Sequence, residues 1–304
     1  MSQKLHTKTI KIAHSPDSDD AFMFYAIKEA KIDLKGYKFE ISSDEIDILN
    51  NEALNDEFKY DIFAVSFHAF NFLKDKFKIL KSGASMGGKD YGPKLVCRTN
   101  VIQNRSETKM KDPMQLSQQH DLVHWILRFA QNDGFRIAVP GKLTSAYLVL
   151  KEWLKENNIE AEFLFCSYEE VFDLLESGKV DASLLIHEAQ LRYQELGYKL
   201  ITDLGIWWYQ RTNGLNMPLG CNVIRRDLGA ETINELEALL KESIEWGLAN
   251  FDEVLDYSRK FANNKLDNAA AKKYIEMYVN DSTVELSSDD LKSIDLLLSV
   301  IASD

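Results

Sequence analysis

The eight residues Asp181–Glu188, DASLLIHE, carry the most information about this fold. Their small and apolar run, ASLLI, is typical of a buried strand, and it stops abruptly at His187 and Glu188. In an α/β sheet, ligands bind outside the carboxyl ends of the strands. An imidazole held there can transfer a proton near neutral pH. The alternative is a polar pair that merely closes the strand.

Working outward, strand-like and helix-like segments alternate in two series, about Thr9–Arg98 and Phe135–Gln190. Alternation of this kind predicts parallel or mixed sheets covered by helices, so we expect an α/β protein with two lobes. From about Leu228 onward the apolar residues recur with helical spacing, as at Leu236, Leu239 and Leu240.

The two series set the expected domain boundaries. Lobe 1 is expected to be discontinuous, comprising residues 1–98 and 204–304, and lobe 2 to comprise residues 99–203. The ligand cleft is expected between the lobes, a common location for a small-molecule site.

Residues 100–134 interrupt this pattern with a long polar, glutamine-rich stretch, which we interpret as a surface insertion. His120 and His124 lie four residues apart within it, a spacing that suits metal ligands on a helix. The intervening sequence offers neither a general-base glutamate beside His120 nor an evident third ligand. We therefore predict no metal site.

Composition narrows the function classes. The 304 residues carry a formal net charge of −12, which disfavours a nucleic-acid partner or an anionic membrane surface. Cysteines number three, Cys97, Cys166 and Cys221, and their wide spacing favours reduced thiols over a disulfide framework. The first residues lack the apolar core of a signal peptide, and no window is apolar for the ~18 residues of a membrane span. We expect a cytoplasmic protein.

Hydroxyl-bearing residues follow three of the predicted strands. HSPDSDDAFMFY brings Ser15 and Asp20 between a strand and a helix, and AVPGKLTSAY brings Thr144 and Ser145 to a similar turn. Ser66 ends the strand-like IFAVS. The free N–H groups of a strand-to-helix turn suit an anionic ligand, although helix capping explains part of each pattern.

These segments resemble one known family. HSPDSDDAFMFYA, AVPGKLTSAY, LLIHEAQ, DLGIWWYQRTNGLNMPLG and YVN occur in the order and approximate spacing of the 1,4-dihydroxy-6-naphthoate synthases, which serve the futalosine pathway of menaquinone biosynthesis. The resemblance spans nearly the whole chain. Its departures are the insertion at 100–134 and GLNMPLG, which stands where a more proline-rich run is typical.

The resemblance implies a fold similar to type 2 periplasmic binding proteins. It also implies a lyase that converts cyclic de-hypoxanthine futalosine into 1,4-dihydroxy-6-naphthoate and a dihydroxyacetone fragment, with no cofactor. His187 corresponds to the histidine proposed as the family's proton acceptor. The matching substrate contacts are Ala64, Val65, Ser66, Ser145 and Ala146, with Thr144 adjacent.

Other residues are assigned from their chemistry. Ser15 and Asp20 are further candidates for substrate binding. Trp207 could form an apolar wall, with core packing as the alternative, and Arg211 could be a counter-charge, with a surface ion pair as the alternative. Glu188 could orient His187, but we favour its capping the next helix.

Two competing functions stay open. A chorismate dehydratase of the same pathway has a similar fold, and a non-catalytic small-molecule receptor can share it as well. The base-like His187 and the LLIHE block favour the synthase. The expected partner is an anionic small molecule, and the sequence leaves a homodimer open.

Overall fold

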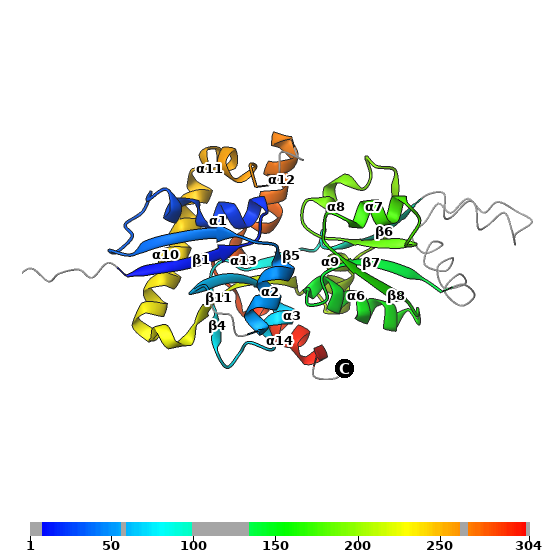
Figure 1. The fold of residues 1–304 in the computed structure, drawn as a ribbon, viewed down its shortest axis with the longest axis horizontal. Helices are drawn as coiled ribbons and strands as arrows, with labels where there is room; N and C mark the ends of the chain where they lie inside the picture. Colours follow the sequence, from blue (N-terminus) through cyan, green and yellow to red (C-terminus); the bar gives the residue numbers. More distant parts are fainter. Residues whose placement is uncertain (1–7, 56–58, 99–133, 262–266, 302–304) are drawn as a thin grey trace, which may run out of the picture. The chain divides into compact units, whose positions relative to one another are not determined.

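The computed structural model describes residues 8–55, 59–98, 134–261 and 267–301. The chain divides into two compact units, one formed by Met1–Met86 with Pro218–Asp304 and the other by Gly87–Met217 (Figure 1). Each unit contains one sheet with helices packed against it, so the α/β expectation is confirmed. The predicted insertion, residues 100–134, lies outside the described residues apart from Gly134, and so do His120 and His124.

The first unit is built on a mixed sheet with the strand order β2-β1-β3-β11-β4, and β5 also pairs with β11. β2, β1 and β3 are parallel, whereas β11 runs antiparallel to β3 and β4. β3 reads IFAVS and is buried along its whole length, as an apolar run in the centre of a covered sheet should be. The strands are β1 (Thr9–His14), β2 (Lys38–Ser43), β3 (Ile62–Ser66), β4 (Phe77–Ile79), β5 (Ser85–Gly87) and β11 (Met217–Arg225).

Helices of the first unit come from both ends of the chain. α1 is buried from Ser18 to Ile27, because α10, α11 and α12 pack around it. At one crossing a Cβ on Gly247 would lie 2.9 Å from the Phe22 ring, so a glycine is needed for the helices to approach. The helices are α1 (Ser18–Lys28), α2 (Ile46–Leu54), α3 (Phe67–Phe70), η1 (Arg226–Leu228), α10 (Ala230–Ala249), α11 (Phe251–Ser258), α12 (Asn268–Tyr278), α13 (Asp281–Val284) and α14 (Ser288–Ile301).

The second unit, drawn mostly in green in Figure 1, has the strand order β10-β6-β9-β7-β8. β9, β7 and β8 are parallel, whereas β6 runs antiparallel to both of its neighbours. The elements are β6 (Lys94–Arg98), β7 (Arg136–Pro140), α6 (Ser145–Glu156), β8 (Glu162–Cys166), α7 (Val171–Glu176), β9 (Ala182–Leu185), α8 (Ala189–Arg192), β10 (Tyr198–Asp203) and α9 (Leu204–Arg211).

The division of the chain differs from the expected boundaries at 98/99 and 203/204. β6 was expected in lobe 1, but it pairs with β9 and β10 in the second unit. α9 was also expected in lobe 1, and it packs on α6 instead. Asp203 fixes the start of α9 directly after β10, because its carboxylate caps the helix through the N–H groups of Gly205 and Ile206, at 3.0 and 3.1 Å.

Candidate active site

Three parallel strands of the second unit, β8, β7 and β9, end at one edge of the sheet. The chain leaves β7 toward Thr144 and Ser145, leaves β8 toward Tyr168, and leaves β9 toward His187. The carboxyl edge of parallel strands is the usual ligand-binding edge of such sheets. Residues that are distant in the sequence therefore gather at a chemically suitable position.

His187 lies just beyond β9, which ends at Leu185, so it belongs to a turn and not to the strand. Its φ of 51° is left-handed, a conformation that costs a non-glycine residue roughly 1–3 kcal/mol. The His187 carbonyl accepts a hydrogen bond from the Gln190 N–H at 3.2 Å. The half-buried imidazole meets the ring of Tyr168 edge to face, with the ring centroids 5.5 Å apart and the planes at 77°.

Glu188, expected to cap the next helix, occupies the N-cap position of α8 and is buried. Its side chain makes no capping hydrogen bond, so the predicted capping role was wrong. The backbone at Glu188 is already in the helical region, whereas a capping residue normally keeps an extended backbone.

The turn after β7 was predicted correctly as a helix start. Thr144 is the N-cap of α6, and its hydroxyl accepts the Tyr147 N–H at 3.2 Å and donates to the Gly141 carbonyl at 3.1 Å. These bonds give Thr144 a role in shaping the turn. Ser145 and Ala146 form the first turn of this 12-residue helix, where the amide groups and the helix dipole favour a negative charge.

In the first unit, the predicted contact residues Ala64, Val65 and Ser66 form the buried end of β3. Ser66 is held by Asn50 of α2, a residue that the sequence analysis missed. The Ser66 N–H donates to Asn50 Oδ1 at 3.0 Å, and Asn50 Nδ2 donates to Ser66 Oγ at 2.8 Å. Because an N–H can only donate, the atom facing it must be the amide oxygen, which fixes both ends of the amide.

The two hydrogen bonds with Asn50 determine whether the Ser66 hydroxyl donates or accepts. Its oxygen accepts a hydrogen bond from Asn50, which leaves its own O–H to donate to another acceptor, such as an anionic oxygen. A sequence signal existed for Asn50, because it shares the buried face of α2 with Leu49 and Ala53 although it is polar. A polar residue in an apolar stripe normally has a specific partner.

The loop after β1 is stabilised by its own residues. Asp20 accepts the Ser15 N–H at 2.9 Å, and both residues are buried. Next to them, His14 Nδ1 lies 2.8 Å from the Ser15 carbonyl oxygen, and its ring stacks on Phe24. Burial lowers the pKa of His14, which keeps this imidazole neutral at pH 7.

Three carboxylates where this loop enters α1 could hold a cation. Asp17, Asp19 and Asp20 bring oxygens within 4.8 Å of one another, and all three are buried. Asp17 is the N-cap residue of α1, and Asp19 and Asp20 lie in its first turn. Acidic residues at the N-terminus of a helix also interact favourably with the helix dipole, with no metal required.

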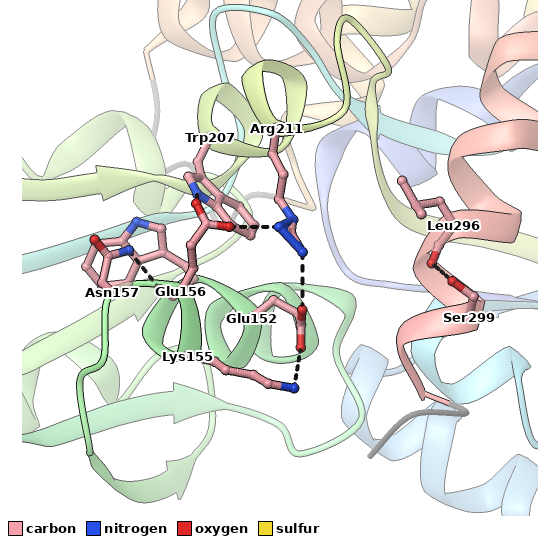
Figure 2. A network of polar contacts seen from close by, with 9 residues as sticks. Glu152, Lys155, Glu156, Asn157, Trp207, Arg211, Leu296 and Ser299 are labelled. Atoms are coloured by element: carbon pink, nitrogen blue, oxygen red, sulfur yellow. Dashed lines mark hydrogen bonds and ion pairs between the residues drawn. The ribbon is translucent and has the colours of Figure 1, made fainter.

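Arg211 and Trp207 lie on α9 and face α6 in the arrangement shown in Figure 2. The guanidinium of Arg211 lies 2.7 Å from Glu156 and 3.6 Å from Glu152, and it stacks over the Trp207 ring at 5.3 Å. Trp207 Nε1 donates to Glu156 at 3.3 Å. The surface ion pair kept as the alternative for Arg211 is therefore present, and it ties two helices of one unit together.

Comparison with known proteins agrees with this architecture. A family model described as "Menaquinone biosynthesis" matches residues 10–303. The chain belongs to the menaquinone biosynthesis family. Two curated members named 1,4-dihydroxy-6-naphthoate synthase are similar to it. The Thermus thermophilus protein is 28% identical over 94% of this chain and 92% of its own length, and the Streptomyces coelicolor protein is 27% identical over 97% and 94%.

Comparison with solved structures identifies the fold. A protein from Archaeoglobus fulgidus superimposes with a TM-score of 0.81 at 34% identity, covering 98% of both chains. The periplasmic aliphatic sulphonate binding protein of Escherichia coli superimposes with a TM-score of 0.62 at 12% identity, covering 97% of this chain and 88% of its own. The expected periplasmic-binding-protein fold is thus confirmed. Within the described residues, no helix is both long and apolar enough to span a bilayer.

Proposed function

We propose that this chain is a 1,4-dihydroxy-6-naphthoate synthase. In this proposal it is a carbon–carbon lyase that converts cyclic de-hypoxanthine futalosine into 1,4-dihydroxy-6-naphthoate and releases a dihydroxyacetone fragment. The full-length similarity to two curated synthases carries the proposal, since both alignments cover more than nine-tenths of this chain. The neutral-pH chemistry of an imidazole at the carboxyl edge of a parallel sheet supports it.

In the proposed reaction His187 is the base. It takes the proton of a substrate hydroxyl, and the electrons of that O–H bond form the carbonyl of the released dihydroxyacetone fragment. The electrons of the breaking carbon–carbon bond pass to the carbonyl conjugated with it, and enolisation to the aromatic ring supplies driving force. A base within hydrogen-bond reach of its proton contributes about 10²–10⁴-fold to such a step. The Tyr168 contact at 5.5 Å supports an ordered imidazole, as a base needs.

The anionic part of the substrate needs donors of fixed polarity. We assign Ser145 and the first-turn amides of α6 to this task, because the helix dipole favours a carboxylate there. In the first unit, Ser66 is the proposed donor and Ala64 and Val65 line the strand that carries it. Asn50 supports this role by donating to the Ser66 oxygen, which leaves the O–H to donate in turn.

The test is turnover of two substrates by the purified protein. With cyclic de-hypoxanthine futalosine we expect 1,4-dihydroxy-6-naphthoate, detected by its absorbance and mass, and with chorismate we expect no dehydration. Dehydration of chorismate alone would assign the chain to the neighbouring step of the pathway. Binding without turnover of either compound would assign it to the non-catalytic receptors.

His187→Ala tests the residue assignment. We expect kcat to fall about 10²–10⁴-fold with an unchanged circular dichroism spectrum, the usual contribution of a positioned base. A variant that keeps near-normal kcat removes His187 from the mechanism but leaves the substrate assignment standing.

A further inference from the structure

We propose that Tyr168 is a positioning residue for His187, so that its aromatic ring fixes the orientation of the imidazole that removes the proton. This inference rests on the proposed function and adds a residue that the sequence analysis did not single out. It starts from the edge-to-face contact of the two rings, with centroids 5.5 Å apart and planes at 77°. Edge-to-face contacts between aromatic rings are attractive beyond the effect of burial.

His187 lies beyond the end of its strand, so strand pairing does not set the direction of its side chain. β9 ends at Leu185, and the left-handed backbone at His187 turns its side chain away from the strand's regular alternation. The ring of Tyr168 comes from the turn after β8, two strands away in the order β9-β7-β8. The contact therefore connects the ends of two strands across the one between them.

The turn that carries Tyr168 is itself fixed. The carboxylate of Glu170 accepts the Ser167 N–H at 2.9 Å and the Ser167 hydroxyl at 3.0 Å, and the Glu170 N–H returns to the Ser167 carbonyl at 3.2 Å. The hydrogen bonds from Ser167 lower the pKa of Glu170, so this carboxylate stays charged and keeps accepting. Tyr168 lies inside this closed turn, so the backbone from which its ring extends is held in place.

The ring also suits the chemistry. When His187 accepts a proton it becomes a cation, and a cation within about 6 Å of an aromatic centroid is attracted to the ring. The Tyr168 and His187 centroids, 5.5 Å apart, lie within that range. The proposed orienting contact is made by the aromatic ring, so it depends on the ring and not on the Tyr168 hydroxyl.

The experiment compares Tyr168→Phe with Tyr168→Leu in steady-state turnover of cyclic de-hypoxanthine futalosine. We expect the phenylalanine variant to keep kcat within about threefold, because it retains the ring. We expect the leucine variant to lose about 10–100-fold in kcat with KM within about twofold, since small misplacements of a reacting group cost rates of this order. Equal losses in both variants, or no loss in the leucine variant, overturn the proposal.

A double-mutant cycle separates positioning from a general structural effect. If Tyr168 acts through His187, adding Tyr168→Leu to His187→Ala causes no further loss of kcat, because the positioned group is already gone. An additional loss equal to that of the single variant refutes the inference. The cycle also separates the two proposals, since unimpaired His187→Ala rejects the base, whereas an impaired His187→Ala with unimpaired Tyr168→Leu rejects only the positioning role.

Substituting Glu170 tests the same proposal if the Tyr168→Leu variant folds poorly. Glu170 is exposed, so Glu170→Ala is expected to fold normally and to lower kcat severalfold by loosening the turn. Glu160→Ala is the matched control, because Glu160 is also an exposed carboxylate but precedes β8 instead of following it. The same kcat in both variants contradicts a positioning role for the turn.

Discussion

Exchanging the buried amide of Asn50 for a carboxylate of nearly the same shape reverses the polarity of the Ser66 hydroxyl and places an acidic group beside it. In Asn50→Asp, one carboxylate oxygen still accepts the Ser66 N–H, as Oδ1 does at 3.0 Å. The other oxygen replaces Nδ2, 2.8 Å from Ser66 Oγ, and can no longer donate. The Ser66 hydroxyl must then donate to residue 50, and its proton is withdrawn from the substrate.

The size of the effect follows from the lost bond. A hydrogen bond to a charged group is worth about 1.5–3 kcal/mol, and about 1.4 kcal/mol corresponds to a factor of ten in an equilibrium constant. We therefore expect KM for the anionic substrate, and the Kd of the naphthoate product, to rise about 10–150-fold. kcat should change much less, because the base is untouched.

The assay is steady-state turnover combined with product titration, and urea unfolding followed by tryptophan fluorescence checks that the variant is folded. Ser66→Ala provides the matched background, in which Asn50→Asp should raise KM much less than it does alone, because only the repulsion by the new carboxylate is left. A folded Asn50→Asp protein with KM within threefold of the original would refute the assignment of Ser66 as a donor. A full additional loss in the Ser66→Ala background would instead show that Asn50 acts independently of Ser66.

Three further predictions concern stability and the alternative roles. Gly205→Ala should lower the free energy of unfolding, measured in urea titrations, by about 1–3 kcal/mol, because the added Cβ would lie 2.2 Å from the Tyr91 carbonyl oxygen. Gly220→Ala is the control and should be tolerated, because there the nearest atom to an added Cβ, the Val65 carbonyl oxygen, is 3.5 Å away. Arg211→Ala should change that free energy by less than about 1 kcal/mol, as for other exposed ion pairs, and leave KM unchanged; a tenfold rise in KM would restore its role as a counter-charge. Burial raises the pKa of Cys97 to about 12, so Cys97 in the folded protein should resist alkylation by iodoacetamide at pH 8, which mass spectrometry measures. The stabilisation from the neutral thiol should be complete below the ordinary thiol pKa and be lost as the pH rises from there toward 12. Rapid alkylation of Cys97 in the native protein would contradict this burial.

Much of the local structure could be predicted because its causes are local. The start of α6 follows from a cap residue, Thr144, placed after a Pro-Gly turn, and the structure contains that cap. The C-terminal helices follow from apolar spacing, as in α10 with Leu236, Leu239 and Leu240 buried. The central position of β3 follows from an uninterrupted apolar run.

Other features were missed because they depend on pairing over long distances. β6 looks like a continuation of the first βα series, and only its antiparallel pairing with β9 and β10 assigns it to the second unit. α9 was not predicted as a helix, although the Asp203 cap before its apolar residues was a readable signal.

The candidate site shows the same division. His187 and Ser145 could be selected from residue type and strand position, whereas their neighbours could not. Asn50 is separated from Ser66 by 16 residues, and Tyr168 from His187 by 19, so nothing local connects either pair. Only the packing of α2 on β3 and the order of the second sheet bring them together.

The left-handed backbone of His187 sets stability against activity at a single position. Glycine has no steric penalty in that region and asparagine tolerates it better than most residues, so a chain optimised for heat resistance alone would exchange the imidazole for one of them. Directed evolution for a higher melting temperature should therefore select glycine or asparagine at position 187, and so inactive proteins, unless turnover is selected as well. If His187 is the proposed base, position 187 is a place where the protein accepts a less stable fold in order to keep that base.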